Sequence, residues 1–155
     1  MSGKNKSALI VGGTGITGRS VIESLERRSD WNITALSRRK PDFETKAEFI
    51  SVDLLDDKDS EKKLSELSGI THFFYCGLSG GIEAENVEGN LKLLTNSLGN
   101  CNKIFNADIK FLGIFFAKFN RTEKIYQEAY SFLKDEIGTH LIEQTVSKST
   151  KIDIS

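Results

Sequence analysis

The stretch Ala8-Leu-Ile-Val-Gly-Gly-Thr-Gly-Ile-Thr-Gly18 decides the fold of this chain. Its first four residues are apolar and predict a short buried strand, which ends at a pair of glycines. A helical pattern of apolar residues begins near Ile16, directly after the turn. A strand, a glycine-rich turn and a helix in this order indicate a nucleotide-binding βα unit.

Two glycine spacings fit this turn, Gly13-x-Gly15-x-x-Gly18 and Gly12-x-x-Gly15-x-x-Gly18. In either spacing, one glycine permits the tight turn and a second lets a pyrophosphate approach the backbone. A third lets the following helix pack close to the strand. The N-terminus of that helix offers free N–H groups and the positive end of its dipole to phosphates. We therefore expect Gly12, Gly15 and Gly18 to form a cofactor-binding turn.

The chain of 155 residues is long enough for one domain with its own hydrophobic core. Its net charge of −1 provides no field that would attract nucleic acid or an anionic membrane. Cys76 and Cys101 suggest no disulfide framework, and the polar segment Met1–Ser7 does not resemble a signal peptide. His72 and His140 show no metal-ligand spacing. These features predict a cytoplasmic protein without a metal site.

Short strands alternate with amphipathic helices, which predicts an α/β fold with a Rossmann-like, doubly wound parallel sheet. The apolar pattern predicts strands at residues 7–11, 31–37, 48–52, 70–76 and 110–116. It predicts helices at residues 15–28, 58–67, 82–98 and 122–137. We expect residues 1–155 to form a single domain.

The end of the second predicted strand distinguishes between dinucleotides. Ser37 lies 19 residues beyond Gly18 (37 − 18), where an Asp or Glu would bind an unphosphorylated ribose 2′-hydroxyl. Arg38 and Arg39 follow instead, and arginine forms charge-assisted bonds to a 2′-phosphate that a carboxylate would repel. The alternative interpretation is a solvated surface loop. We favour NADP(H) as the cofactor, with these three residues at its phosphoribose.

Two further strand ends are expected to border the cofactor crevice, because this edge of a doubly wound sheet faces it. Asp53 follows the third predicted strand and could accept a hydrogen bond from the adenine amine. We favour this contact with adenine; the alternative is a turn or helix N-cap residue. Cys76 ends the fourth predicted strand, where a small wall residue is more expected than a reactive thiol.

With these residues in hand, the chain resembles the short-chain dehydrogenase/reductase superfamily, and within it the progesterone 5β-reductase/iridoid synthase-like group. The resemblance covers roughly residues 7–100 and rests on Ala8–Gly18, Ala35–Arg39, Val52–Leu54, Thr71–Tyr75, Glu83–Asn86 and Asn90. It implies an NADPH-dependent reductase acting on an activated carbon–carbon double bond of an enone or enal, a small-molecule carbonyl substrate. In such a reaction the protein aims the hydride and stabilises the developing enolate oxygen.

The resemblance also implies a role for each matching residue. It puts Thr14, Gly15 and Ile16 at the pyrophosphate, Ser37, Arg38 and Arg39 at the phosphoribose, Asp53 and Leu54 beside adenine, and Cys76 near the inner ribose.

The second half of the chain departs from that group, whose members are considerably longer. Residues 101–155 are diverged, so we expect a truncated domain. Lys118 lies near the place of the group's lysine, but the tyrosine motif is missing. Tyr130-x-x-x-Lys134 has the spacing of the superfamily's catalytic pair, and we interpret it as an ordinary amphipathic helix. No catalytic residue is assigned. A non-catalytic NADP(H)-sensing or interaction module remains the alternative.

Overall fold

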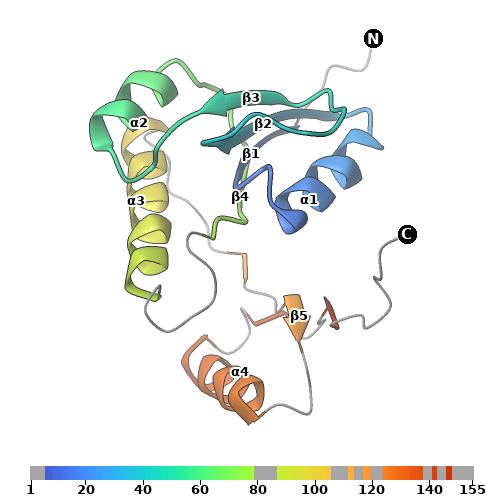
Figure 1. Cartoon of the computed structure of the whole chain (residues 1–155), viewed down its shortest axis with the longest axis vertical. Coiled ribbons are helices and arrows are strands. Elements are labelled where there is room, and N and C mark those ends of the chain that lie inside the picture. Colours follow the sequence, from blue (N-terminus) through green and yellow to red (C-terminus); the bar gives the residue numbers. More distant parts are fainter. Residues whose placement is uncertain are drawn as a thin grey trace. The chain divides into compact units, whose positions relative to one another are not determined.

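The computed structural model describes residues 6–78, 87–105, 112–113, 117–119, 124–137, 141–142 and 146–147. The chain forms two compact units, Met1–Asp108 and Ile109–Ser155. The first unit holds a sheet of four parallel strands with helices packed on it (Figure 1).

In the first unit the elements are β1 (Lys6–Val11), α1 (Ile16–Glu26), β2 (Trp31–Ser37), β3 (Glu48–Ser51), α2 (Asp57–Leu64), β4 (His72–Tyr75) and α3 (Val87–Phe105). The strand order is β3-β2-β1-β4, so the chain moves outward from β1 to β3 and then crosses to the other side of β1. This reversal at β1 is the switch point of a doubly wound sheet, beside which ligands of such folds bind. The predicted Rossmann-like fold class is confirmed.

The register brings the carboxyl ends of the four strands to one edge of the sheet. Val11 at the end of β1 is paired with Leu36 and with Tyr75, and Ser37 is paired with Ser51. The residues that follow each strand therefore emerge side by side. This edge is where the sequence predicted the cofactor crevice.

Alternation along β1 explains the core on both faces of the sheet. Ala8 and Ile10 are fully buried against Ile22 and Leu25 of α1. Successive side chains of a strand point to opposite faces, so Leu9, which is also fully buried, lies under the other face. Figure 1 shows α1 on one side of the sheet and α2 with α3 on the other.

Helix α3 extends beyond its predicted end. The regular spacing of apolar residues predicted a helix that ends at Leu98, but α3 continues through Gly99 to Phe105. Gly99 is exposed and a Cβ placed there would meet nothing within 4 Å. A helical glycine costs about 1 kcal/mol relative to alanine, which is too little to end a helix of 19 residues. Residues 82–86, where the helix was predicted to begin, lie outside the described residues.

Strand β4 is shorter and less buried than predicted. The apolar run from Ile70 to Cys76 predicted a strand covered on both faces, whereas β4 spans His72–Tyr75 and all four of its residues are only partly buried. Among the described strands β4 pairs with β1 alone, so it lies at the edge of the sheet. An edge strand has one neighbour fewer to cover it.

The second unit contains β5 (Ala117–Phe119), α4 (Lys124–Ile137) and β6 (Val146–Ser147). β5 and β6 pair in parallel as a separate two-stranded sheet. The predicted helix at 122–137 is present from Lys124 onward, its first two residues lying outside the described part. Of the strand predicted at 110–116 only Leu112 and Gly113 are described, and neither belongs to a strand.

None of the helices in the described part of the chain has the length and apolar character that crossing a bilayer requires.

Candidate functional site: a cavity at the carboxyl edge of the sheet

The turn after β1 depends on Gly12. Its φ of +78° lies in the left-handed region, where a side chain is strained. A Cβ at this position would also approach the backbone oxygen of Cys76 to 2.5 Å. The turn is closed by two backbone bonds, from the Gly12 N–H to the Leu36 oxygen at 2.9 Å and from the Gly15 N–H to the Gly12 oxygen at 3.0 Å. The glycine is required by the geometry of the turn itself.

Gly18 shapes the turn from within α1. It is buried, and a Cβ there would collide with the carbonyl group of Gly12. Its absence of a side chain lets the first turn of α1 lie against the glycine loop, which is the close helix–strand packing expected of the third glycine. Gly18 and Ile16 are the two predicted site residues that do not line the cavity described below, and the Ile16 side chain is 74% exposed.

The N-terminus of α1 has no cap from its own sequence. Gly15 occupies the N-cap position with an extended backbone, no side chain accepts a bond from the helix there, and the first turn holds no acidic residue. The first N–H groups of a helix need a partner from outside the helix. This helix end is therefore suited to an anion.

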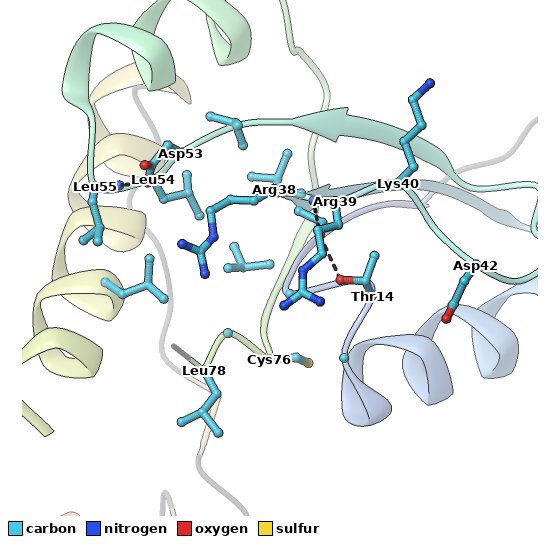
Figure 2. Close-up of a pocket in the computed structure, with 18 residues that line it drawn as sticks. Thr14, Arg38, Arg39, Lys40, Asp42, Asp53, Leu54, Leu55, Cys76 and Leu78 are labelled. Carbon is cyan, nitrogen blue, oxygen red and sulfur yellow. Dashed lines mark hydrogen bonds between the residues drawn. The ribbon is translucent and has the colours of Figure 1, made fainter. Parts of the chain in front are cut away.

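A cavity of about 430 Å³ opens at this edge of the sheet (Figure 2). The predicted site residues that line it are Gly12, Thr14, Gly15, Ser37, Arg38, Arg39, Asp53, Leu54 and Cys76. They come from the ends of β1, β2, β3 and β4, so the structure brings together residues that are distant in sequence.

The sequence analysis missed several residues of the same wall, namely Asp42, Leu55, Leu78 and Leu93. Leu55 and Leu78 follow the third and fourth strands, so their place after a strand end was a usable signal. Leu93 belongs to α3, and nothing in its local sequence separates it from other apolar residues of that helix.

The three cations after β2 differ in direction. In Figure 2 the Arg38 side chain extends toward Asp53 and Leu54, whereas the Arg39 guanidinium lies beside Thr14. Lys40 extends away from the cavity. Within the described part of the chain neither guanidinium forms an ion pair, although Asp42 and Asp53 line the same cavity.

The Ser37 hydroxyl joins the two turns that border the cavity. It lies 2.8 Å from the Thr14 hydroxyl and accepts a hydrogen bond from the backbone N–H of Arg39 at 3.2 Å. Thr14 belongs to the glycine turn and Arg39 to the turn after β2. One side chain therefore connects both.

The loop that returns from the arginines to β3 is fixed against α1. The Phe43 ring packs edge-on against Phe49 at 6.2 Å, and the Arg19 guanidinium lies 4.6 Å from the Phe43 centroid. Glu26 accepts hydrogen bonds from the Thr45 hydroxyl and the Lys46 N–H, both at 2.6 Å. Burial raises the pKa of Glu26, but these bonds together outweigh it and hold the pKa below its usual range.

Asp53 is a turn residue that also lines the cavity. Its Oδ1 accepts a bond from the Leu55 N–H at 3.0 Å, which makes it a turn residue. It also lines the cavity, as the adenine hypothesis requires. The N-cap of α2 is Asp56, whose side chain accepts from the N–H groups of Lys58 and Asp59.

Cys76 is a half-buried wall residue of the cavity. Burial raises the pKa of its thiol above the usual range, which keeps the sulfur protonated and poorly nucleophilic at neutral pH. This agrees with a wall residue rather than a reactive group.

The residues considered for catalysis lie in the second unit, Lys118 in β5 and Tyr130 and Lys134 in α4. Among the residues described as lining the cavity there is no tyrosine, and the lysine is Lys40. Nor does the described part contain a group of three or more metal-ligating side chains.

The sequence profile of the NAD dependent epimerase/dehydratase family matches residues 8–106. The (S)-8-oxocitronellyl enol synthase of Nepeta cataria is 40% identical over 99 residues, which cover 59% of this chain and 26% of that protein. The 3-oxo-Delta(4,5)-steroid 5-beta-reductase of Arabidopsis thaliana is 35% identical over 99 residues, with the same shares of 59% and 26%. The matched part is therefore about a quarter of the length of these relatives.

Solved structures share the fold. The ADP-L-glycero-D-manno-heptose-6-epimerase of Helicobacter pylori has a TM-score of 0.56 at 13% identity, over 93% of this chain and 55% of that one. A short-chain dehydrogenase/reductase superfamily protein of Agrobacterium tumefaciens, solved with bound NAD, has a TM-score of 0.51 at 15% identity, over 72% and 32%. The resemblance inferred from the motifs is confirmed. Because the profile match spans well over half of the chain, this chain belongs to the NAD dependent epimerase/dehydratase family.

Proposed function

We propose that this chain binds NADP(H) in the cavity at the carboxyl edge of the sheet. The observation that carries the proposal is the pair of guanidiniums of Arg38 and Arg39, which line the cavity after β2 where the NAD-binding pattern would have a carboxylate. A 2′-phosphate is the part of NADP(H) that needs positive charge at this position.

The cavity residues fit such a cofactor in distinct ways. The N–H groups at the uncapped start of α1, behind Gly15, suit the pyrophosphate. Asp53 and Leu54 border the space for adenine, and Cys76 borders the inner ribose. Bound NADPH would supply a hydride; the described residues bind and orient it, and shape the surrounding wall.

We further propose that the chain is the cofactor half of an NADPH-dependent reductase of carbon–carbon double bonds in enones or enals. The support is the similarity to a 3-oxo-Delta(4,5)-steroid 5-beta-reductase and to (S)-8-oxocitronellyl enol synthases over 59% of this chain. The substrate would be a small carbonyl compound.

The cofactor proposal is tested by fluorescence titration with NADPH and with NADH. Replacing both arginines, Arg38→Ala with Arg39→Ala, removes the charges that meet the 2′-phosphate. NADPH affinity is expected to fall by about 2–4 kcal/mol, for two charged hydrogen bonds lost, while NADH affinity changes little.

The matched control removes two arginines elsewhere, Arg27→Ala with Arg28→Ala, which are exposed after α1 and outside the cavity. It should leave both affinities as they are. A wild-type chain that prefers NADH, or an Arg38/Arg39 variant that loses both cofactors equally, would contradict the assignment.

A second candidate function is a non-catalytic module that binds NADP(H) without turning it over. It is favoured by the composition of the cavity wall, whose described residues include no tyrosine and whose Lys40 extends away from it. Incubation with NADPH and a panel of enals and enones separates the two candidates. Loss of absorbance of the reduced nicotinamide supports the reductase, and tight binding without turnover supports the module.

A further inference from the structure

The hydroxyl of Ser37 links the glycine turn to the arginine turn in the described wall of the cavity. It lies 2.8 Å from the Thr14 hydroxyl, across a sequence separation of 23 residues, and 3.2 Å from the Arg39 nitrogen. In the view of Figure 2 the Arg39 guanidinium lies near the Thr14 side chain.

A serine hydroxyl can take part in both bonds at once, and either hydroxyl can be the donor between Ser37 and Thr14. A hydroxyl has one hydrogen to donate and two lone pairs to accept with. The Arg39 N–H can only donate, so Ser37 accepts from it with one lone pair. When the hydrogen of Ser37 points to Thr14, the Thr14 hydrogen is free to turn toward the cavity, which Thr14 lines.

The resulting order is Arg39 N–H to Ser37 hydroxyl to Thr14 hydroxyl to ligand. Hydrogen bonds in such a series strengthen one another. Thr14 borders the place of the pyrophosphate, and Arg39 is one of the two cations proposed for the 2′-phosphate. The series therefore connects the places proposed for the two phosphate-bearing parts of the cofactor, the central pyrophosphate and the 2′-phosphate of the adenosine ribose.

We propose that Ser37 is a positioning residue which couples recognition of the pyrophosphate to recognition of the 2′-phosphate. It acts through Thr14 and Arg39: the hydroxyl pair holds the arginine turn in the orientation that the 2′-phosphate needs. This inference rests on the proposed function, since it concerns how the same cavity selects its phosphorylated ligand.

The test measures the dissociation constants for NADPH and NADH. The selectivity is the dissociation constant for NADH divided by that for NADPH, so a higher ratio means a stronger preference for NADPH. Thr14→Val keeps the shape of the side chain and removes the hydroxyl. A contact to the pyrophosphate alone would weaken NADPH and NADH equally and leave the ratio unchanged. The coupling instead predicts that Thr14→Val lowers the ratio about three- to tenfold, as for one hydrogen bond lost.

Ser37→Ala is expected to lower the ratio by a similar factor. The double variant, Thr14→Val with Ser37→Ala, should lower it no further than either single change, because both remove the same bond. Thr14→Ser and Ser37→Thr keep the hydroxyls and should retain the selectivity. Ser65→Ala deletes an exposed hydroxyl at the end of α2, outside the cavity, and serves as the matched control.

The outcomes separate the two proposals. If the wild-type chain prefers NADPH but Thr14→Val leaves the ratio unchanged, the coupling is wrong and the cofactor assignment stands. If the single losses add up in the double variant, Ser37 and Thr14 act independently and the coupling is again wrong. If the wild-type chain binds neither dinucleotide, the proposed function fails and this inference fails with it.

Discussion

At the scale of single residues, two glycines with similar backbone angles have very different surroundings. Gly12 has a φ of +78° and Gly69 a φ of +69°, so a side chain is strained at both. At Gly69 a Cβ would meet nothing within 4 Å, whereas at Gly12 it would lie 2.5 Å from the Cys76 oxygen. A substitution at Gly69 therefore tests backbone strain alone, whereas one at Gly12 tests backbone strain together with a steric clash.

We expect Gly69→Ala to lower the free energy of unfolding by about 1–2 kcal/mol, the cost of a left-handed non-glycine residue. Gly12→Ala should lower it by about 1–3 kcal/mol more, because overpacking is added to the strain. Urea unfolding of the two variants measures the difference. Equal losses would show that the turn can move away from Cys76.

Ser37, Arg38 and Arg39 were found from sequence because a spacing rule points to one position, 19 residues after the last glycine (37 − 18). The hydrogen bond between Ser37 and Thr14 could not be predicted in this way. This bond depends on the parallel pairing of β1 with β2, which puts Ser37 at the end of β2 beside the glycine turn that follows β1.

At the scale of elements, local pattern predicted the central strands β1 and β2 more closely than the helix ends or the edge strand β4. β2 has the predicted bounds, Trp31–Ser37, because polar residues flank its largely apolar sequence, Ser29 and Asp30 before it and Arg38 and Arg39 after it. α3 continues past its predicted end at Leu98, because Gly99 costs too little free energy to end a helix of 19 residues. Leu93 reaches the cavity only through the packing of that helix, which no local pattern contains.

The loop between β2 and β3 contributes stability that depends on pH. The pKa of Glu26 is lowered in the folded chain from the ordinary value of 4.5. A depressed pKa gives stability that is fully present above the ordinary value and lost as pH falls through the folded value. We therefore expect the urea midpoint of the wild-type chain to fall as the pH is lowered below about 4.5.

Glu26→Gln removes the titrating group while keeping its size, so this part of the acid sensitivity should disappear. The comparison is made between urea midpoints of the two chains near neutral pH and in acid. Glu23→Gln, on the same helix and paired with Arg19, is a control for the loss of a helical carboxylate. Parallel pH curves for the wild-type and Glu26→Gln chains would contradict the prediction.

At the scale of the whole molecule, the strand order β3-β2-β1-β4 locates the cavity more firmly than any single residue does. The alternation of strands and helices was sufficient to predict this doubly wound arrangement. It was not sufficient to predict that Ile109–Ser155 forms a unit of its own with a separate small sheet. Its short strands lack the long apolar runs on which such predictions depend.

The net charge of −1 bears on how the ligand would be attracted. Because the molecule as a whole is nearly neutral, electrostatic attraction of NADPH has to come from the local charges of Arg38 and Arg39. Added salt screens such exposed charges. Raising ionic strength should therefore weaken NADPH binding several-fold more than NADH binding.

In the Arg38→Ala, Arg39→Ala variant this difference in salt response between the two dinucleotides should vanish. Titrations at low and high sodium chloride, with each dinucleotide, measure it. An equal salt response of the two dinucleotides in the wild-type chain would show that Arg38 and Arg39 are not the source of the electrostatic attraction for NADPH.

The bare start of α1 has a thermodynamic consequence for the free chain. A side-chain cap would add about 0.5–2 kcal/mol to a helix, and Gly15 supplies none. An anion that occupies this end binds only the native form, so occupancy and folding are linked equilibria. The free energy of unfolding of the unliganded chain is therefore lower than it would be with a capped helix. The folded fraction rises with the concentration of the anion that binds at the start of α1.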